Sequence, residues 1–268
     1  MATDSPYLIK PDSKVRLKHH ASNDTGKLTD SDEAKPLLEG HRKRLDKLQE
    51  VLYAGAERGL LVVLQGMDTA GKDGTIRSIF DGVNPQGCNV AAFKVPTPLE
   101  QKHDFLWRCH AAVPPRGMIG IFNRSHYEDV LSPRVHELIS EKTAKHRMQQ
   151  INDFEAMLVD NGIAVLKFFL HISPDEQKSR LQARIDNQDK HWKLSAGDFA
   201  ERKFWPDYQK CYEEIFEQTS TKQAPWFVIP ADEKWYRNVA ISGIIADTLE
   251  GMKLKYPTST IDVSTLKL

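Results

Sequence analysis

The stretch that decides the fold is LLVVLQGMDTAGKDG, which runs from Leu60 to Gly74. It begins with an apolar run of strand length and then matches the spacing G-x-x-x-x-G-K, in which Gly66 and Gly71 precede Lys72. Backbone N–H groups in such a glycine-rich loop form a concave anion site, and the N-terminus of the next helix adds positive charge. We therefore predict a strand, a phosphate-binding loop and a helix in this order, rather than a glycine-rich turn with a surface lysine.

The residue after the lysine is Asp73, where nucleotide hydrolases and kinases place the Ser or Thr that holds magnesium. A carboxylate in the first turn of a helix suits the helix dipole and the free N–H groups there. We therefore expect Asp73 to support the loop structurally rather than to bind the metal.

The composition indicates a soluble globular protein of one large domain or two small ones. The 268 residues carry no net formal charge, which argues against a general nucleic-acid or membrane-surface binder but permits a local basic channel. Three scattered cysteines form no C-x-x-C pair, the N-terminus lacks an apolar signal core, and no apolar run approaches membrane length. We therefore expect a reduced, cytoplasmic protein with neither nucleic acid nor membrane as partner.

Apolar runs of strand length alternate with helix-like segments along most of the chain. The predicted strands are Leu60–Gln65, Asn89–Val95, Gly117–Asn123, Ala164–Ile172 and Pro225–Ala231. This alternation is typical of a parallel sheet that is covered by helices on both faces. We predict a three-layer α/β/α fold with a five-stranded, mainly parallel sheet, and ligands at the edge where the strand C-termini gather.

The predicted organisation is one domain with two polar ends. Residues 1–34 are expected to form an extended N-terminal arm on the domain, residues 35–257 a single domain, and residues 258–268 a tail. A polar excursion at about residues 178–204 is expected to form a helical lid. Helices are also predicted at residues 36–54 and at about residues 234–254.

The segment FNRSHYEDVL, residues 122–131, follows the third predicted strand and should emerge at the same sheet edge. Arg124 can hold a phosphate through two parallel hydrogen bonds. Glu128 and Asp129 are paired carboxylates that could bind a metal or balance charge, although acids also favour the first turn of any helix. Ser125 and His126 are disfavoured as nucleophile and base, because adjacent residues rarely face each other.

The predicted lid is basic. Residues 178–203 hold seven Lys or Arg against four acids, and Arg180 and Arg184 share one helix face. A solvated helical surface would explain this pattern. A mobile lid that closes over a polyanionic substrate and excludes water would explain it as well, and we favour this second interpretation.

These segments together resemble the polyphosphate kinase 2 family, and the resemblance covers the chain from about Tyr7 to Pro257. It rests on GMDTAGKDGTI, FKVPT, HDFLWR, FNRSHYEDVL, KFFLHIS, RIDNQDKHWK and APWFVIPADEKWYRN. The resemblance implies a thymidylate-kinase-like phosphate-loop fold, phosphoryl transfer between inorganic polyphosphate and nucleotides, magnesium as cofactor, and a homotetramer built as a dimer of dimers.

Many members of the family carry Asp where this chain has Asn123. The N-R-S-H-Y-E-D version resembles the class that accepts both AMP and ADP and makes ATP from AMP in two steps. Asp68 matches one metal-site aspartate of the family. Because position 123 is Asn, we assign the second metal aspartate to Asp129, with Glu128 as a further candidate.

The expected mechanism needs no general base, because the acceptor phosphate oxygen is already an anion at neutral pH. Catalysis is then positioning and charge neutralisation, with Lys72 and Arg124 on the transferring group and Asp68 and Asp129 as metal ligands. The lid cations are expected to follow the polyphosphate chain. The predicted phosphate-binding residues are Thr69, Ala70, Gly71, Lys72, Asp73, Gly74, Lys94, Arg124, Arg134, Arg180, Arg184, Lys190 and Lys193.

Two other functions fit the same sequence. An ordinary nucleoside monophosphate kinase would use the same loop and lid with ATP as donor, and a non-catalytic module would only bind polyphosphate or nucleotide. An assay with AMP, polyphosphate and magnesium but no ATP separates the first rival, and a Lys72→Ala variant separates the second.

Overall fold

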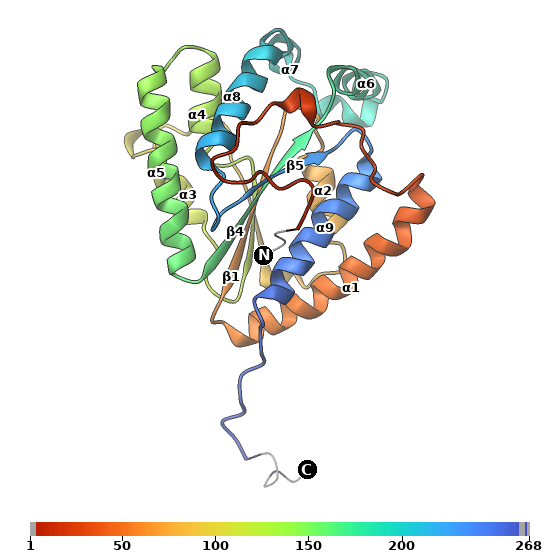
Figure 1. Ribbon diagram of the computed structural model, residues 1–268, viewed down its shortest axis with the longest axis vertical. Coiled ribbons are helices and arrows are strands. Elements are labelled where there is room, and N and C mark those ends of the chain that lie inside the picture. The colour runs from red at the N-terminus through yellow and green to blue at the C-terminus, as the bar shows by residue number, and fades with distance from the viewer. Residues whose placement is uncertain (1–3, 263–265, 267–268) are drawn as a thin grey trace.

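The computed structural model describes residues 4–262 and 266, and its centre is a five-stranded sheet in which every neighbouring pair is parallel (Figure 1). The strand order is β2-β3-β1-β4-β5, so the strand that leads into the glycine-rich loop lies in the middle. The strands are β1 (Gly59–Gln65), β2 (Cys88–Ala92), β3 (Ile119–Asn123), β4 (Ile163–His171) and β5 (Trp226–Pro230). The predicted α/β fold is confirmed.

Helices cover both faces of the sheet. Figure 1 shows α1, α2 and α9 on one face and α3, α4, α5 and α8 on the other. Their bounds are α1 (Ser31–Gly55), α2 (Lys72–Ile79), α3 (Trp107–Ala112), α4 (Glu128–Val135), α5 (Glu141–Asp160), α6 (Pro174–Ile185), α7 (Ala196–Ala200), α8 (Trp205–Thr219) and α9 (Lys234–Gly251). Short 3-10 segments lie at Leu17–His19, Pro85–Gly87, Glu100–Lys102, Gln188–Lys193 and Glu201–Phe204.

Strand β1 shows why an unbroken apolar run forms the middle of this sheet. Successive side chains of a strand point to opposite faces. Leu60, Val62 and Leu64 pack in the cluster that includes residues of α1 and α9, whereas Leu61 and Val63 pack in the cluster that includes residues of α5. Because both faces are covered by helices, every position of β1 is buried and apolar side chains are favoured throughout.

Most element boundaries differ by a few residues from the sequence predictions, and two of these differences have a clear cause. Helix α1 begins at Ser31 rather than at residue 36, because the side chain of Asp30 accepts hydrogen bonds from the N–H groups of Asp32 and Glu33 and caps the helix there. Strand β2 ends at Ala92 rather than at residue 95, because its partner β3 ends opposite it at Asn123.

The N-terminal segment lies along the edge of the sheet beside β5. Leu8 forms an antiparallel bridge with Phe227, the N–H of Ile9 donates to the carbonyl of Trp226, and the N–H of Val228 donates to the carbonyl of Tyr7. The segment therefore covers an edge strand whose polar backbone groups would otherwise be exposed.

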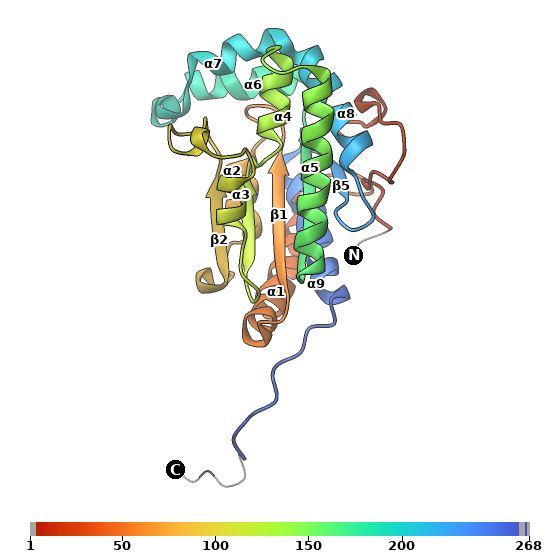
Figure 2. The same cartoon turned by 90° about the vertical axis from the view of Figure 1, so that its left-hand side faces the viewer.

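The predicted lid region contains most of α6, together with α7 and two 3-10 segments, and it lies over the carboxyl ends of the strands (Figure 2). After α9 the chain leaves the domain (Figure 2). Of the predicted tail, residues 258–262 and 266 are described, and the remaining residues lie outside the described part. Within the described residues, no helix has the length and apolarity that a membrane span requires.

Candidate active site

The glycine-rich loop has the backbone geometry that a phosphate cradle needs. Gly66 has φ 153°, and a Cβ there would lie 2.9 Å from the carbonyl oxygen of Leu170, so only glycine fits without displacing β4. Thr69 has φ 66° and Gly71 has φ 103°, both in the left-handed region. The loop therefore turns sharply between β1 and α2, which begins at Lys72.

Lys72 is buried at the foot of this loop, with 9% of its surface exposed. Its ammonium group donates to the carbonyl oxygens of Gly66 at 2.8 Å and of Met67 at 3.4 Å. Burial, together with the positive charge of Arg124, lowers the pKa of Lys72 to about 8. The side chain is therefore held within the loop as a cation whose charge titrates close to neutral pH.

Arg124 joins the loop to the end of β3. Its backbone has φ 63°, which is uncommon for a residue other than glycine and is typical of functional sites. Its guanidinium contacts the Asp68 carboxylate at 2.6 Å and the Glu128 carboxylate at 3.2 Å. Two carboxylates from different parts of the chain therefore meet on one arginine.

Asp129 has different partners from those of Asp68 and Glu128. Its carboxylate contacts Arg108 of α3 at 2.9 Å, and its backbone carbonyl accepts from Arg147 of α5. Successive residues of a helix point about 100° apart around its axis, and Glu128 and Asp129 accordingly contact different arginines. The geometry therefore favours Glu128 over Asp129 as the carboxylate that works with Asp68.

Asp73 contacts neighbouring side chains of the sheet edge and of the lid. It accepts from the amide of Asn123 at 2.7 Å, and the ammonium group of Lys193 lies 3.4 Å away. Partial burial opposes the charged form of Asp73, but the Asn123 amide and Lys193 more than offset it and hold its pKa below the ordinary value. The residue thus connects α2, β3 and the lid.

The four predicted lid cations differ in their surroundings, and Lys193 is the one that contacts Asp73. Lys190 is exposed, and Arg184 contacts Asp198 within the lid at 3.4 Å. Arg180 is buried and donates to backbone carbonyls of the loop instead of lying on the lid surface. The expectation that Arg180 follows a polyphosphate chain is therefore wrong, because its guanidinium is directed into the protein.

Two further predicted residues lie apart from the loop contacts described above. Lys94 is exposed, and its backbone carbonyl accepts from Arg108. Arg134 lines a surface hollow with Lys210 and Glu214 of α8. In the described part of the chain, no hydrogen bond or ion pair connects either side chain with the loop. The other predicted phosphate-binding residues, Thr69, Ala70, Gly71, Lys72, Asp73 and Gly74, form the loop and the first turn of α2.

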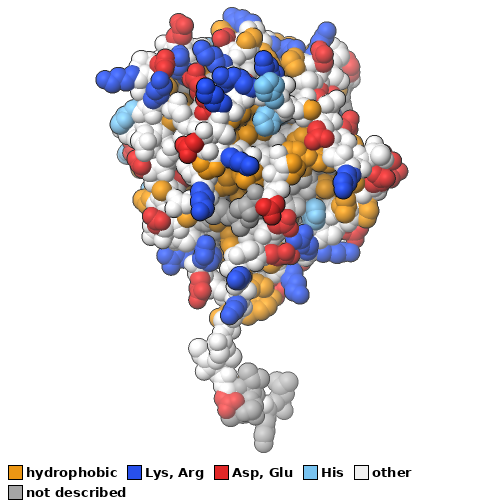
Figure 3. All heavy atoms as spheres, viewed as in Figure 1, with side chains coloured by type: hydrophobic (Ala, Val, Ile, Leu, Met, Phe, Trp, Pro, Cys, Tyr) orange, Lys and Arg blue, Asp and Glu red, His pale blue; other side chains and the backbone are white. Residues whose placement is uncertain are grey.

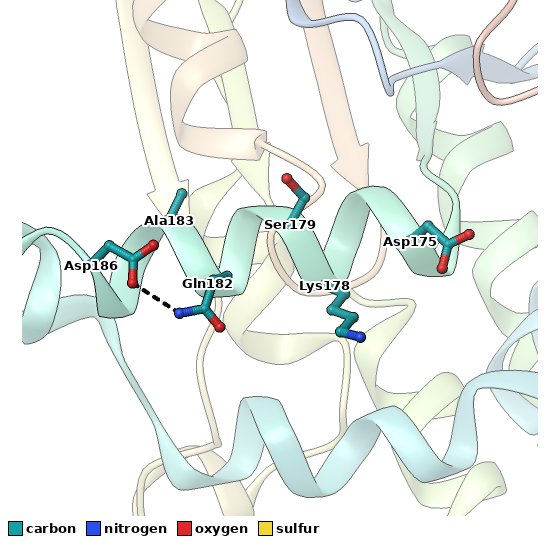
Figure 4. A pocket seen from close by; sticks show the side chains of 6 residues that line it. All are labelled: Asp175, Lys178, Ser179, Gln182, Ala183 and Asp186. Atoms are coloured by element: carbon teal, nitrogen blue, oxygen red, sulfur yellow. Dashed lines mark hydrogen bonds between the residues drawn. The ribbon is translucent and has the colours of Figure 1, made fainter.

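A second hollow lies along α6 and is separate from the site. Asp175, Lys178, Ser179, Gln182, Ala183 and Asp186 line it (Figure 4). All six belong to or directly follow one helix, and the only contact drawn among them is the Gln182–Asp186 hydrogen bond. The hollow includes no residue of the loop or of the strand ends, so it adds nothing to the chemistry there.

The positions of Ser125 and His126 do not favour a nucleophile and base, in agreement with the sequence analysis. Both are completely buried, and a ring nitrogen of His126 lies 3.2 Å from the Glu155 carboxylate. Glu155 also contacts the ammonium group of Lys167 at 2.5 Å, in a network that includes the hydroxyl of Tyr127. This network lies beneath the start of α4 and supports the turn that carries Arg124 and Glu128.

The arrangement suits a polyanionic ligand. Figure 3 shows several Lys and Arg side chains at the end of the molecule where α6 and α7 lie, interspersed with Asp and Glu side chains. Below them, the loop offers backbone N–H groups, Lys72 and Arg124 offer positive charge, and Asp68 and Glu128 offer oxygen atoms. Phosphate groups could be bound by the cations and a hard divalent cation by the carboxylates.

Comparisons with known proteins point in the same direction. The family model described as polyphosphate kinase 2 matches residues 28–257. An AMP/ADP-polyphosphate phosphotransferase from Meiothermus ruber is 50% identical over 252 residues, which cover 94% of each chain. An ADP-polyphosphate phosphotransferase from Rhodopseudomonas palustris is 44% identical, over 84% of this chain and 82% of that protein. The crystal structure of polyphosphate kinase 2 from Arthrobacter aurescens TC1 superimposes with a TM-score of 0.91 at 42% identity, covering 96% of this chain and 95% of the other.

Proposed function

This chain belongs to the polyphosphate kinase 2 family, and we propose that it transfers phosphoryl groups from inorganic polyphosphate to AMP and ADP. The products would be ADP and ATP. The observation that carries this proposal is the meeting of Lys72, Arg124, Asp68 and Glu128 around a phosphate loop beneath a basic lid. The similarity to an AMP/ADP-polyphosphate phosphotransferase over almost the whole chain supports the choice of both acceptors.

The chemistry would consist of positioning and charge neutralisation. The attacking oxygen of a nucleotide phosphate is already negative at neutral pH, so no side chain has to remove a proton. Lys72 would exchange its contacts with the loop carbonyls for a phosphate oxygen, and Arg124 would hold the transferring group through its planar fork. Loop N–H groups would fix the donor in line with the acceptor.

A magnesium ion fits the carboxylates of this site. Mg²⁺ in phosphoryl-transfer sites is usually held by one or two carboxylates together with substrate phosphates, so a group of three protein ligands is not needed. Asp68 and Glu128 supply two carboxylates on one guanidinium, whereas Asp129 is directed to Arg108. Bound there, magnesium would neutralise part of the charge on the donor and acceptor phosphates.

Two properties remain predictions that stand beside this function. The family resemblance implies a homotetramer built from dimers, and the scattered, unpaired cysteines favour a reducing compartment such as the cytoplasm. Sedimentation and cell fractionation measure them directly.

Initial rates with polyphosphate or ATP as the only donor test the proposed function. We expect AMP and ADP to be phosphorylated with polyphosphate and magnesium, and Lys72→Ala to reduce this rate at least about a hundredfold with the fold intact. Reaction with ATP and a nucleoside monophosphate but not with polyphosphate would instead identify a nucleoside monophosphate kinase. An unchanged rate in Lys72→Ala would remove the loop from the mechanism.

A further inference from the structure

Side chains of α6 and α9 donate hydrogen bonds to the carbonyl oxygens of the phosphate loop. Gln177 donates to the carbonyl of Asp68 at 3.0 Å. Arg180 donates to the carbonyls of Thr69 at 3.0 Å and Ala70 at 2.9 Å. These contacts turn the carbonyl side of consecutive peptide groups toward the protein interior.

Arg237 of α9 adds a second guanidinium at the same place. It donates to the carbonyl of Ala70 at 3.1 Å, so this one oxygen accepts from two arginines. A Cβ on Gly71 would lie only 2.2 Å from a guanidinium nitrogen of Arg237. The absence of a side chain at Gly71 therefore lets Arg237 approach the loop backbone.

Neither arginine is placed to touch a substrate. Arg180 is 8% exposed, and its donors also contact Glu176 and the backbone carbonyls of Ala231 and Asp232. Arg237 is 2% exposed, and its Nε and Nη2 atoms donate to the side-chain oxygen of Asn238. Any effect on bound phosphate must therefore act through the loop or through the electric field.

Arg237 has no carboxylate counterpart among residues 4–262 and 266 within ion-pair distance. Burial, together with the positive charge of Arg180, lowers its pKa to about 9. A buried charge without a partner destabilises a protein, and an apolar side chain of similar volume is often equally stable or better. Arg237 contacts the loop backbone at Ala70, so a phosphate bound by the loop would bring a negative charge toward it.

We propose that Arg180 and Arg237 are positioning residues that orient the phosphate loop and that Arg237 strengthens its binding of polyphosphate through its unpaired charge. Because the carbonyls of Asp68, Thr69 and Ala70 are fixed inward, the N–H groups of Thr69 and Gly71 in the same planar peptide units point to the opposite side, whereas that of Ala70 donates to the carbonyl of Met67. This inference rests on the proposed function, because it takes polyphosphate as the ligand of the loop. It adds two residues from outside the loop and β3 to the phosphate-binding machinery.

Three variants test the charge of Arg237. Arg237→Met removes the charge, and Arg237→Lys keeps it. Arg44→Met is the matched control, because Arg44 of α1 already has two carboxylate partners, Asp247 and Glu250, on the exposed side of α9. The dissociation constant for polyphosphate is measured by calorimetry, kcat and KM with ADP are measured separately, and the melting temperature is measured without ligand.

We expect Arg237→Met to bind polyphosphate at least about tenfold more weakly, with a melting temperature that is unchanged or raised. Arg237→Lys should retain binding within about threefold, and Arg44→Met should bind as the wild type does. If Arg237→Met does not fold, Arg237→Gln provides the neutral variant. Wild-type affinity in the neutral variant, or equal losses in the neutral and Lys variants, would overturn the inference. Failure of the wild type to use polyphosphate at all would instead refute the proposed function.

Discussion

Replacing the carboxylate by an amide at Glu128 should mainly change the magnesium requirement. The same replacement at the neighbouring Asp129 should mainly lower the stability. The Glu128 carboxylate contacts Arg124, and the two side chains are 16% and 39% exposed, so this pair of residues four apart contributes roughly 0.5 kcal/mol to stability. The Asp129 carboxylate contacts Arg108, and the two side chains are only 16% and 6% exposed. Removing one partner of such a buried pair costs about 3–5 kcal/mol, because the other charge stays buried.

Asp129→Asn should therefore be mainly a stability variant. A loss of about 3 kcal/mol corresponds to a fall in melting temperature of roughly 6–12 °C for a domain of this size. Glu128→Gln should melt within about 2 °C of the wild type. Its magnesium concentration for half-maximal rate should rise at least about tenfold, because one of two carboxylate ligands is lost.

The assay follows the initial rate of ADP phosphorylation against magnesium concentration, at a temperature where both variants are folded. A melting scan of each variant accompanies it. If Asp129→Asn shifts the magnesium requirement as much as Glu128→Gln does and melts like the wild type, Asp129 is the metal ligand and the geometric assignment is wrong.

Three further predictions follow from the same contacts. Burial and the charge of Arg124 lower the pKa of Lys72 to about 8, and the charged form is the one that binds phosphate. The value of kcat/KM for polyphosphate should therefore be level below about pH 8 and fall above it. A profile that is flat to pH 9.5 would contradict this role. Glu155→Gln leaves the buried ammonium group of Lys167 without its counter-charge. It should therefore lower the free energy of unfolding, measured by denaturant titration, by about 3 kcal/mol or more. A loss below about 1 kcal/mol would show that the pair is not needed for stability. Asp68→Asn should reduce the magnesium-dependent rate about a hundredfold, and Asp73→Asn no more than about tenfold. Equal losses would contradict the assignment of Asp68 as a metal ligand and of Asp73 as a structural residue.

The fold was predictable because its signals are local. The apolar run of β1, the glycine spacing of the loop and the following helix are adjacent in the chain, and their order determines a parallel sheet with its ligands at one edge. Arg124 was found for the same reason, since it directly follows a strand whose position in the sheet is clear from its apolar pattern.

The direction of individual side chains was not predictable in the same way. Whether Glu128 or Asp129 faces Asp68 depends on the rotation of α4 against α3 and α5, which sequence spacing does not reveal. Arg180 was assigned to the lid surface because it shares a helix face with Arg184, yet the start of α6 packs against the loop and buries it.

Arg237 was missed because it lies far from the loop in sequence and belongs to a mostly buried helix. The signal that could have found it is a basic residue in the segment EKWYRN, next to the last strand of a sheet whose C-terminal edge binds ligands. A charge at the start of a buried helix is costly, so its presence there invites a search for a partner.

The central claim is that polyphosphate phosphorylates AMP and then ADP at this one site. The most direct measurement is a time course with AMP, polyphosphate and magnesium, with all ATP removed, in which the nucleotides are separated and quantified. We expect ADP to appear first, to pass through a maximum, and to be followed by ATP. No nucleotide product, or ADP that accumulates without any ATP, would contradict the account.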